Sequence, residues 1–177
     1  MPHVSNFLQT NHKILLDLIN ADNSTSLPET AVTFGAPATV EGDATGLITN
    51  VTASATIGSG YSGSQDFTYN RVGLGFMLVN EPDLVIETNE TSKHALIPFL
   101  NETFGIQLTA DDIEDGVVET QEPDVMKEIT FTAKAGSLVW AGSVTLPITL
   151  PLIPLNTVLT VTNLDGLYPP APVVEPA

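Results

Sequence analysis

The segment LLDLINADNSTSLPETAV (Leu15–Val32) decides the fold, because a similar segment, LIPFLNETFGIQLTADDI (Leu96–Ile113), occurs later in the chain and aligns with it without a gap. Most apolar positions of the two segments correspond, and three pairs of positions hold the same residue: Leu15 and Leu96, Asn20 and Asn101, Leu27 and Leu108. Self-similarity at a fixed spacing is typical of a duplicated structural unit. We therefore interpret the chain as two tandem copies of one unit.

The similarity continues downstream, with gaps of one residue. VTASA (51–55) aligns with FTAKA (131–135), and YSGSQDFTY (61–69) aligns with WAGSVTLPI (140–148). Helical periodicity predicts helices over 4–19, where Ser5 or Asn6 caps the start, and over 93–104; alternating segments predict strands over 47–57, 65–72, 128–135 and 138–150. A shorter helix, capped by Thr109, is expected in LTADDIEDG (108–116).

These elements predict an α+β fold. It consists of two tandem helix-plus-β-hairpin repeats packed through small antiparallel sheets, with an extended Pro-rich arm at the C-terminus. We expect the first repeat at residues 1–82, the second at 83–155, and a C-terminal strand with the arm at 156–177. Because one helix on a two-stranded hairpin is only marginally stable, the two copies should pack against each other.

The composition argues against several classes of partner. The 177 residues include 21 acidic and five basic side chains, for a net charge of −16, and no cysteine. Phosphate backbones and anionic headgroups need clustered Lys or Arg, so we expect neither a nucleic acid nor a membrane partner. The N-terminus lacks the pattern of a secretory signal, and no apolar run is long enough to span a bilayer.

The segment GSGYSG (58–63) fits the G-x-G-x-x-G pattern of dinucleotide-binding loops. Such a loop must end a strand and open a helix, whereas the residues that follow, SQDFTYNRV, alternate as in a strand. The second copy, GSLVWAGS (136–143), loses the middle glycine. We therefore interpret the glycines as a hairpin connection and expect no cofactor.

Other candidate sites are weak. The acidic cluster of Asp111, Asp112, Glu114 and Asp115 lacks the spacing of a calcium loop, so we interpret it as a helix N-terminus in solvent. His3, His12 and His94 lack the spacing of a zinc site, so no metal is expected. His12 and His94 lie near corresponding helix starts, as a duplication predicts. No nucleophile motif is present, so we expect no enzymatic activity. Carboxylates paired across the fold leave a hydrolase as a weaker alternative.

The aromatic residues Trp140, Tyr61 and Tyr69 leave two interpretations open. They could form a platform for a carbohydrate, which would make the protein a glycan-binding adhesion module. However, Trp140 aligns with Tyr61, and a shared aromatic position in a hairpin more often packs in the core or across strands. We favour packing.

The combination LINADNSTSL (18–27), VTFGAP (32–37) and GSGYSGSQDFTYNRV (58–72) resembles the small repeat domain of virion structural proteins of large tailed bacteriophages. The resemblance covers residues 4–150, and the second copy lacks the YNR ending. It implies a structural part located in the virion, with other virion proteins and further copies of itself as partners. It implies no catalytic residues.

We therefore expect a non-enzymatic virion component. The preferred assignment is a capsid decoration protein or another outer-surface component. The alternative is a neck, tail or baseplate protein. Contacts with neighbouring chains are expected from two Pro-rich segments, LPITLPLIPL (146–155) and the tail from Leu167. The predicted interaction residues are Leu146, Pro147, Pro151, Pro154, Tyr168, Pro169 and Pro170.

Overall fold

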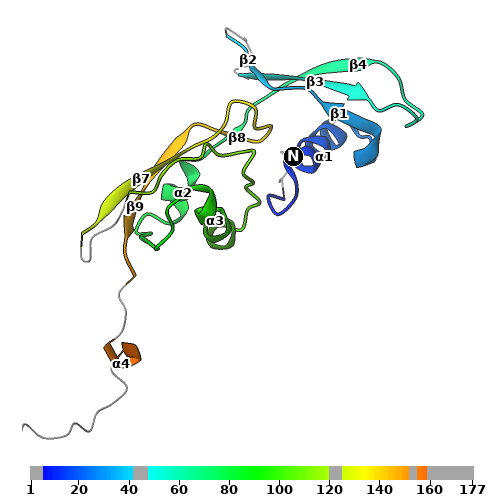
Figure 1. Ribbon diagram of the computed structural model, residues 1–177. Helices are drawn as coiled ribbons and strands as arrows, with labels where there is room; N and C mark the ends of the chain where they lie inside the picture. The colour runs from blue at the N-terminus through cyan, green and yellow to red at the C-terminus, as the bar shows by residue number, and fades with distance from the viewer. Residues whose placement is uncertain (1–5, 42–47, 120–124, 152–154, 159–177) are drawn as a thin grey trace, which may run out of the picture.

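The computed structural model describes residues 6–41, 48–119, 125–151 and 155–158, and it has an α+β fold. Two lobes lie side by side (Figure 1). The first, called repeat 1 below, contains α1 (Asn11–Asn23), η1 (Glu29–Ala31), β1 (Val32–Phe34), β2 (Ala38–Thr39), β3 (Thr49–Ala55) and β4 (Ser64–Tyr69). The second, repeat 2, contains η2 (His94–Leu96), α3 (Ile97–Phe104), β7 (Lys127–Thr132), β8 (Trp140–Ala141) and β9 (Ser143–Thr149).

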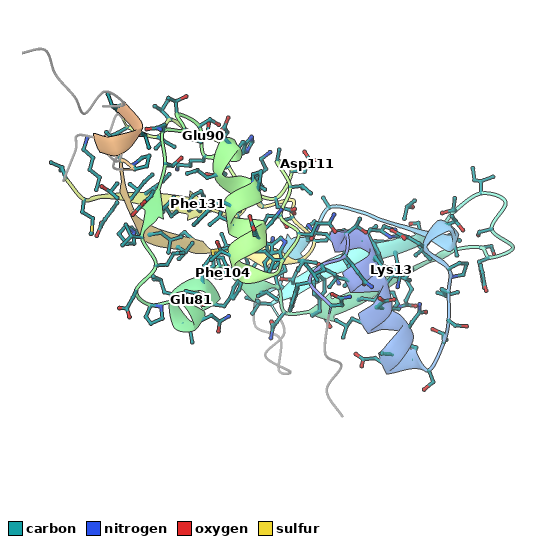
Figure 2. All side chains as sticks on the ribbon, turned by 90° about the horizontal axis from the view of Figure 1, so that it is seen from below. Lys13, Glu81, Glu90, Phe104, Asp111 and Phe131 are labelled. Atoms are coloured by element: carbon teal, nitrogen blue, oxygen red, sulfur yellow. The ribbon has the colours of Figure 1, made fainter. Side chains whose placement is uncertain are left out.

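In the sequence, a connecting segment, residues 70–93, joins repeat 1 to repeat 2. It contains β5 (Val72–Gly73), α2 (Phe76–Asn80) and β6 (Ile86–Glu87). A short helix, α4 (Leu155–Val158), follows repeat 2. Figure 2 shows the two lobes from below, with Lys13 on α1 in one and Phe104 and Phe131 in the other. The predicted division after residue 82 falls inside the connecting segment.

Each repeat is built on a long antiparallel hairpin, and the two hairpins have the same register. In repeat 1, Thr49 faces Tyr69 and Ser54 faces Ser64. In repeat 2, Lys127 faces Ile148 and Thr132 faces Ser143. Thr49 is therefore the equivalent of Lys127 on the first strands, and Ser64 is the equivalent of Ser143 on the second strands.

The register corrects the alignment of the first hairpin strand. The alignment of VTASA with FTAKA is wrong by two positions, since Val51 corresponds to Ile129 and not to Phe131. Side chains alternate with a period of two along a strand, so a slip of two keeps every residue on its face. The alternation alone could not reveal the error.

A second duplicated feature is an asparagine that holds the chain after the helix. Asn20 accepts a hydrogen bond from Leu27 N at 2.9 Å through Oδ1 and donates to Leu27 O at 3.0 Å through Nδ2. Asn101 makes the same pair of bonds to Leu108, at 2.7 and 2.9 Å. An amide side chain can pair with a backbone amide in this way because it offers one donor and one acceptor side by side. The identities noted at these positions therefore fix the turn between helix and first strand.

A third duplicated feature involves the histidines. His12 Nε2 lies 3.0 Å from Val32 O, and His94 Nε2 lies 2.8 Å from Ile113 O. Because a carbonyl can only accept, Nε2 must carry hydrogen in both rings. Each histidine thereby ties the start of its helix to the start of the following extended segment.

The helix starts differ from the prediction. Helix α1 begins at Asn11, where Thr10 Oγ1 accepts from Lys13 N at 3.2 Å, so Thr10 is the N-cap in place of Ser5 or Asn6. The expected short helix after Thr109 is wrong, because residues 110–112 form a single turn and Ile113 bridges to Ala133. The capping signal itself is real: Asp111 N donates to Thr109 Oγ1 at 3.3 Å.

The predicted strand 138–150 is interrupted at Gly142, which has φ of 72°. β8 and β9 lie on its two sides. The left-handed conformation costs glycine little, because it has no Cβ. Turning the chain there separates Trp140, which enters the core, from the hairpin strand β9.

Candidate interaction surface

The connecting segment closes repeat 2. Its strand β5 pairs in parallel with β8, with Val72 N donating to Val139 O at 2.7 Å and Leu74 N to Ala141 O at 2.9 Å. Its strand β6 pairs in parallel with β9. Three of its side chains, Leu74, Met77 and Ile86, are fully buried in the larger hydrophobic core. Repeat 2 is therefore completed by chain that precedes it.

Trp140 lies at the centre of this closed core and is fully buried. Its ring stacks on Phe76 of α2 at 5.9 Å between centroids and meets Phe7 at 5.5 Å. Packing of Trp140 in the core is thus confirmed. Its equivalent Tyr61 is 55% exposed, so the shared aromatic position is buried in only one repeat.

Repeat 1 has an apolar groove at the corresponding place. It has a volume of about 190 Å³ and lies between α1 and the hairpin. Leu16 and Ile19 form its helical wall, Ala53 and Phe67 form its floor on β3 and β4, and Tyr61 stands at its rim. Tyr61 is the only ionisable side chain among the described residues that line it, so the groove suits apolar contact rather than acid–base chemistry.

The residues that leave the groove open are small or polar versions of those in repeat 2. Ala53 stands where repeat 2 has Phe131, which is fully buried, and exposed Gln65 stands where repeat 2 has buried Val144. The wider side chains fill the core of repeat 2, and the connecting segment covers it. Among the described residues β4 pairs with β3 alone, whereas its equivalent β9 pairs on both sides.

The repeats meet at a polar cluster centred on Asp112, which is 2% exposed. Its Oδ1 accepts from Ser137 Oγ at 2.6 Å and also from Asn11 Nδ2, across the junction with repeat 1. Its Oδ2 accepts from Thr109 N at 3.0 Å and Oγ1 at 2.8 Å. The interpretation of this acidic cluster as a solvated helix terminus is wrong for Asp112. The other members, Asp111, Glu114 and Asp115, are exposed.

Asp112 serves the packing of the repeats. The equivalent position in the aligned segment of repeat 1 is Ala31, which is fully buried. A buried carboxylate is tolerated at 112 because four donors surround it. His12 and His94 both direct Nε2 to backbone carbonyls, so these ring nitrogens are engaged in holding the fold.

Two titratable groups in the described part of the chain have shifted pKa values. Burial raises the pKa of Tyr69 to about 12, although the nearby charge of Arg71 lowers it, and the phenol donates to Leu138 O at 2.7 Å. Arg71 donates to the carbonyls of Ala135 and Ser137 at 3.0 and 3.1 Å. Hydrogen bonds from Gly116 N and the Ser92 hydroxyl lower the pKa of Asp115.

The predicted interaction residues are only partly described. Leu146 is fully buried in β9, so the prediction that it contacts another chain is wrong. Pro147 faces Glu128 in the hairpin, at a position where its backbone nitrogen points away from β7. On the other side of β9, pairing with β6 begins only at Ile148. The missing N–H of proline therefore costs the sheet no backbone hydrogen bond. Pro147 and Pro151 are half-buried. Pro154, Tyr168, Pro169 and Pro170 lie outside the described residues.

The carbohydrate platform is not formed by the aromatic residues predicted for it. Trp140 is fully buried and Tyr69 is 8% exposed, which leaves Tyr61 alone at the surface. The segment GSGYSG joins β3 to β4, which confirms the hairpin interpretation, and Gly58, Gly60 and Gly63 all have positive φ. In the described ranges, no three His, Asp or Glu side chains gather in a way that could hold a metal ion.

The fold and the groove define an acidic, duplicated α+β protein with one closed and one open repeat. The chain belongs to a family of unknown function (DUF7941), whose match covers residues 5–174. No curated protein and no solved structure matches it. Within the described part of the chain, no helix has the length and apolar character needed to cross a membrane.

Proposed function

We propose that this protein is a non-enzymatic structural component of a bacteriophage virion that binds neighbouring subunits. Capsid decoration is the assignment that we favour. A neck, tail or baseplate position is the alternative. The proposal combines the resemblance of the repeat sequence to virion repeat domains with the character of the surface of repeat 1.

The observation that carries the binding role is the groove beside Tyr61. Apolar clefts with few polar groups are the places where proteins usually bind other molecules. Here Leu16, Ile19 and Phe67 line an opening that the other repeat fills with protein. The polar side chains with geometry suited to chemistry, Asp112 and the two histidines, already hold the fold together.

The acidic surface supports an external position in the particle. A net charge of −16 disfavours contact with packaged DNA, because the phosphates would repel it. Binding to other proteins through apolar contacts and strand edges is compatible with that charge.

The test is quantitative mass spectrometry of purified particles of the phage that encodes the chain, combined with labelling by an antibody against the purified protein. Hundreds of copies on the shell are expected for decoration, and six or twelve copies at one vertex for a neck or baseplate part. Absence from washed, intact particles would overturn the proposal.

A further inference from the structure

The open groove of repeat 1 has a natural occupant in the sequence of the chain itself. In repeat 2 the corresponding place is filled by the residues that follow the hairpin of repeat 1, namely β5, α2 and β6. If the duplicated units dock in the same way each time, the residues that follow the hairpin of repeat 2 should fill the groove of a repeat 1.

The segment after repeat 2 stands in the same register as the connecting segment. Ser64 and Ser143 are the first residues of the equivalent strands β4 and β9. Phe76, which begins α2, follows Ser64 at the same distance along the chain at which Leu155, which begins α4, follows Ser143. Both hairpins are therefore followed, at the same distance, by a short helix.

Apolar residues recur at this spacing. The connecting segment places Leu74, Phe76 and Val79 where the later segment has Ile153, Leu155 and Val158. Two positions differ, because Pro151 replaces Val72 and Asn156 replaces Met77. Since Pro151 has no N–H, backbone pairing equivalent to that of β5 would begin at Ile153, with Ser62 O in the place of Ala141 O.

The position of α4 favours an occupant supplied by a second molecule. In Figure 1 the chain leaves β9 at the end of repeat 2 that is remote from repeat 1, and α4 lies farther away still. Val158 on α4 is 62% exposed, as expected of an apolar side chain whose partner is elsewhere.

We propose that residues 150–177 of one molecule dock into the groove of repeat 1 of a second copy, as residues 70–93 dock onto repeat 2. Leu155 would meet Tyr61 in this contact, as Phe76 meets Trp140 at 5.9 Å within one chain. The chain after Val158 would extend along the outer edge of β4, in the place that β6 takes beside β9. The contact is head-to-tail, and it holds whether or not the protein is a virion component.

The test uses the full chain and two surface variants. Tyr61→Asp places a charge at the groove rim, and Leu155→Asp with Val158→Asp places charges on α4. The matched control is Ile57→Asp, because Ile57 lies in the same hairpin connection, is fully exposed, and does not line the groove. Sedimentation velocity from about 1 to about 100 µM measures association, a range that covers micromolar dissociation constants.

The wild-type protein is expected to associate with rising concentration, and both variants to weaken association at least about tenfold. The Ile57→Asp control should behave as wild type. Mixing the two defective variants is the most discriminating measurement. Tyr61→Asp keeps an intact tail, and the Leu155→Asp, Val158→Asp variant keeps an intact groove. The mixture should form a dimer with one functional contact at concentrations at which each variant alone stays largely monomeric.

Three results would overturn the proposal: a wild-type protein that stays monomeric throughout, a control as defective as Tyr61→Asp, or a mixture that fails to associate. Emission of Trp140, the single tryptophan of the chain, verifies that each variant is folded. These measurements do not involve virions. A negative result would therefore refute the proposed self-association and leave the proposed virion role to be tested separately.

Discussion

The phenol of Tyr69 on β4 donates a hydrogen bond to the backbone carbonyl of Leu138, 2.7 Å away and on the other side of the repeat junction. Leu138 also packs against both hydrophobic clusters, one centred in each repeat. This pair joins the end of the first hairpin to the segment that leads into Trp140. Leu138 thereby connects the two hydrophobic clusters at the repeat junction.

Tyr69→Phe should remove the bond while keeping the ring. We expect a loss of about 1 kcal/mol in the free energy of unfolding at neutral pH, from the bond and from the carbonyl left without it. Urea titration followed by Trp140 emission measures the change. A loss below about 0.3 kcal/mol would contradict a stabilising junction bond.

Tyr69 also predicts a pH dependence. Its pKa rises from 10.0 to about 12 in the fold, so the unfolded state loses this proton more readily. The contribution to stability is complete below pH 10 and declines as the pH rises from 10 to 12. Absorbance at about 295 nm, where tyrosinate absorbs, should show a folded-state ionisation near pH 12 that Tyr69→Phe lacks. Persistence of that step in the variant would assign it to another tyrosine.

Asp112→Ala should be among the most destabilising single changes. It leaves Ser137 Oγ and Asn11 Nδ2 without their acceptor in a buried site, and we expect a loss of about 2–4 kcal/mol. Asp111→Ala is the matched control, since Asp111 is exposed and adjacent, and its effect should stay within about 0.5 kcal/mol. Thermal unfolding of the three proteins provides the comparison, and equal midpoints would refute the role given to Asp112.

The reciprocal change, Ala31→Asp, should destabilise repeat 1 more than Asp112→Ala destabilises repeat 2. Ala31 is fully buried and lacks the set of donors that surrounds Asp112. An unpaired buried carboxylate costs several kcal/mol or takes up a proton. The variant should therefore gain stability as the pH is lowered from about 7 toward about 5, the opposite of the usual trend, when followed by circular dichroism.

Asn20 and Asn101, each of which clamps a leucine backbone through two hydrogen bonds, should differ in how much stability their replacement by alanine costs. Asn101→Ala is expected to cost about 2 kcal/mol, since Leu108 is buried and its backbone loses both partners. Asn20→Ala should cost less, because Leu27 is half-buried and water can replace the side chain. Hydrogen exchange at the amides of Leu27 and Leu108 reports each clamp directly. Equal protection in variant and wild type would show that the side chains are dispensable.

His94→Gln and His94→Phe separate the hydrogen bond from the packing of the ring. Glutamine can place an N–H near the position of Nε2 and keep the bond to Ile113 O, whereas phenylalanine keeps the ring and loses the bond. We expect the glutamine variant to retain more stability, by about 1 kcal/mol. The reverse order in urea titrations would indicate that packing of the ring dominates.

The duplication could be predicted from the sequence because Asn20 and Asn101 act locally, on chain that follows shortly after each helix. Their partners, Leu27 and Leu108, lie inside the same repeated segment, so identity and function coincide. The hairpins were also predictable, since alternation along β3 and β7 is a property of each strand alone. The short helix after Thr109 was not, because the bridge from Ile113 to Ala133 replaces its second turn, and that pairing joins segments far apart.

The groove could not be predicted for a similar reason. Tyr61 and Trp140 occupy equivalent positions, but the burial of Trp140 depends on Phe76 and Phe7, which lie outside both aligned hairpins. One signal was present in the sequence: repeat 1 has the small residue Ala53 at the core position where repeat 2 has the large residue Phe131. The misalignment of the first hairpin strands by two positions hid it.

The inequality of the two repeats has a geometric consequence. A molecule whose groove and tail are different surfaces leaves one groove and one tail unused in each single contact, unless two molecules exchange tails reciprocally as a dimer. Repetition of the same contact then closes into a ring if the rotation per molecule divides a full turn, and otherwise continues as a fibre. The angle at which repeat 1 meets repeat 2, held by Tyr69, Arg71 and Asp112, would help to set that rotation and with it the number of subunits.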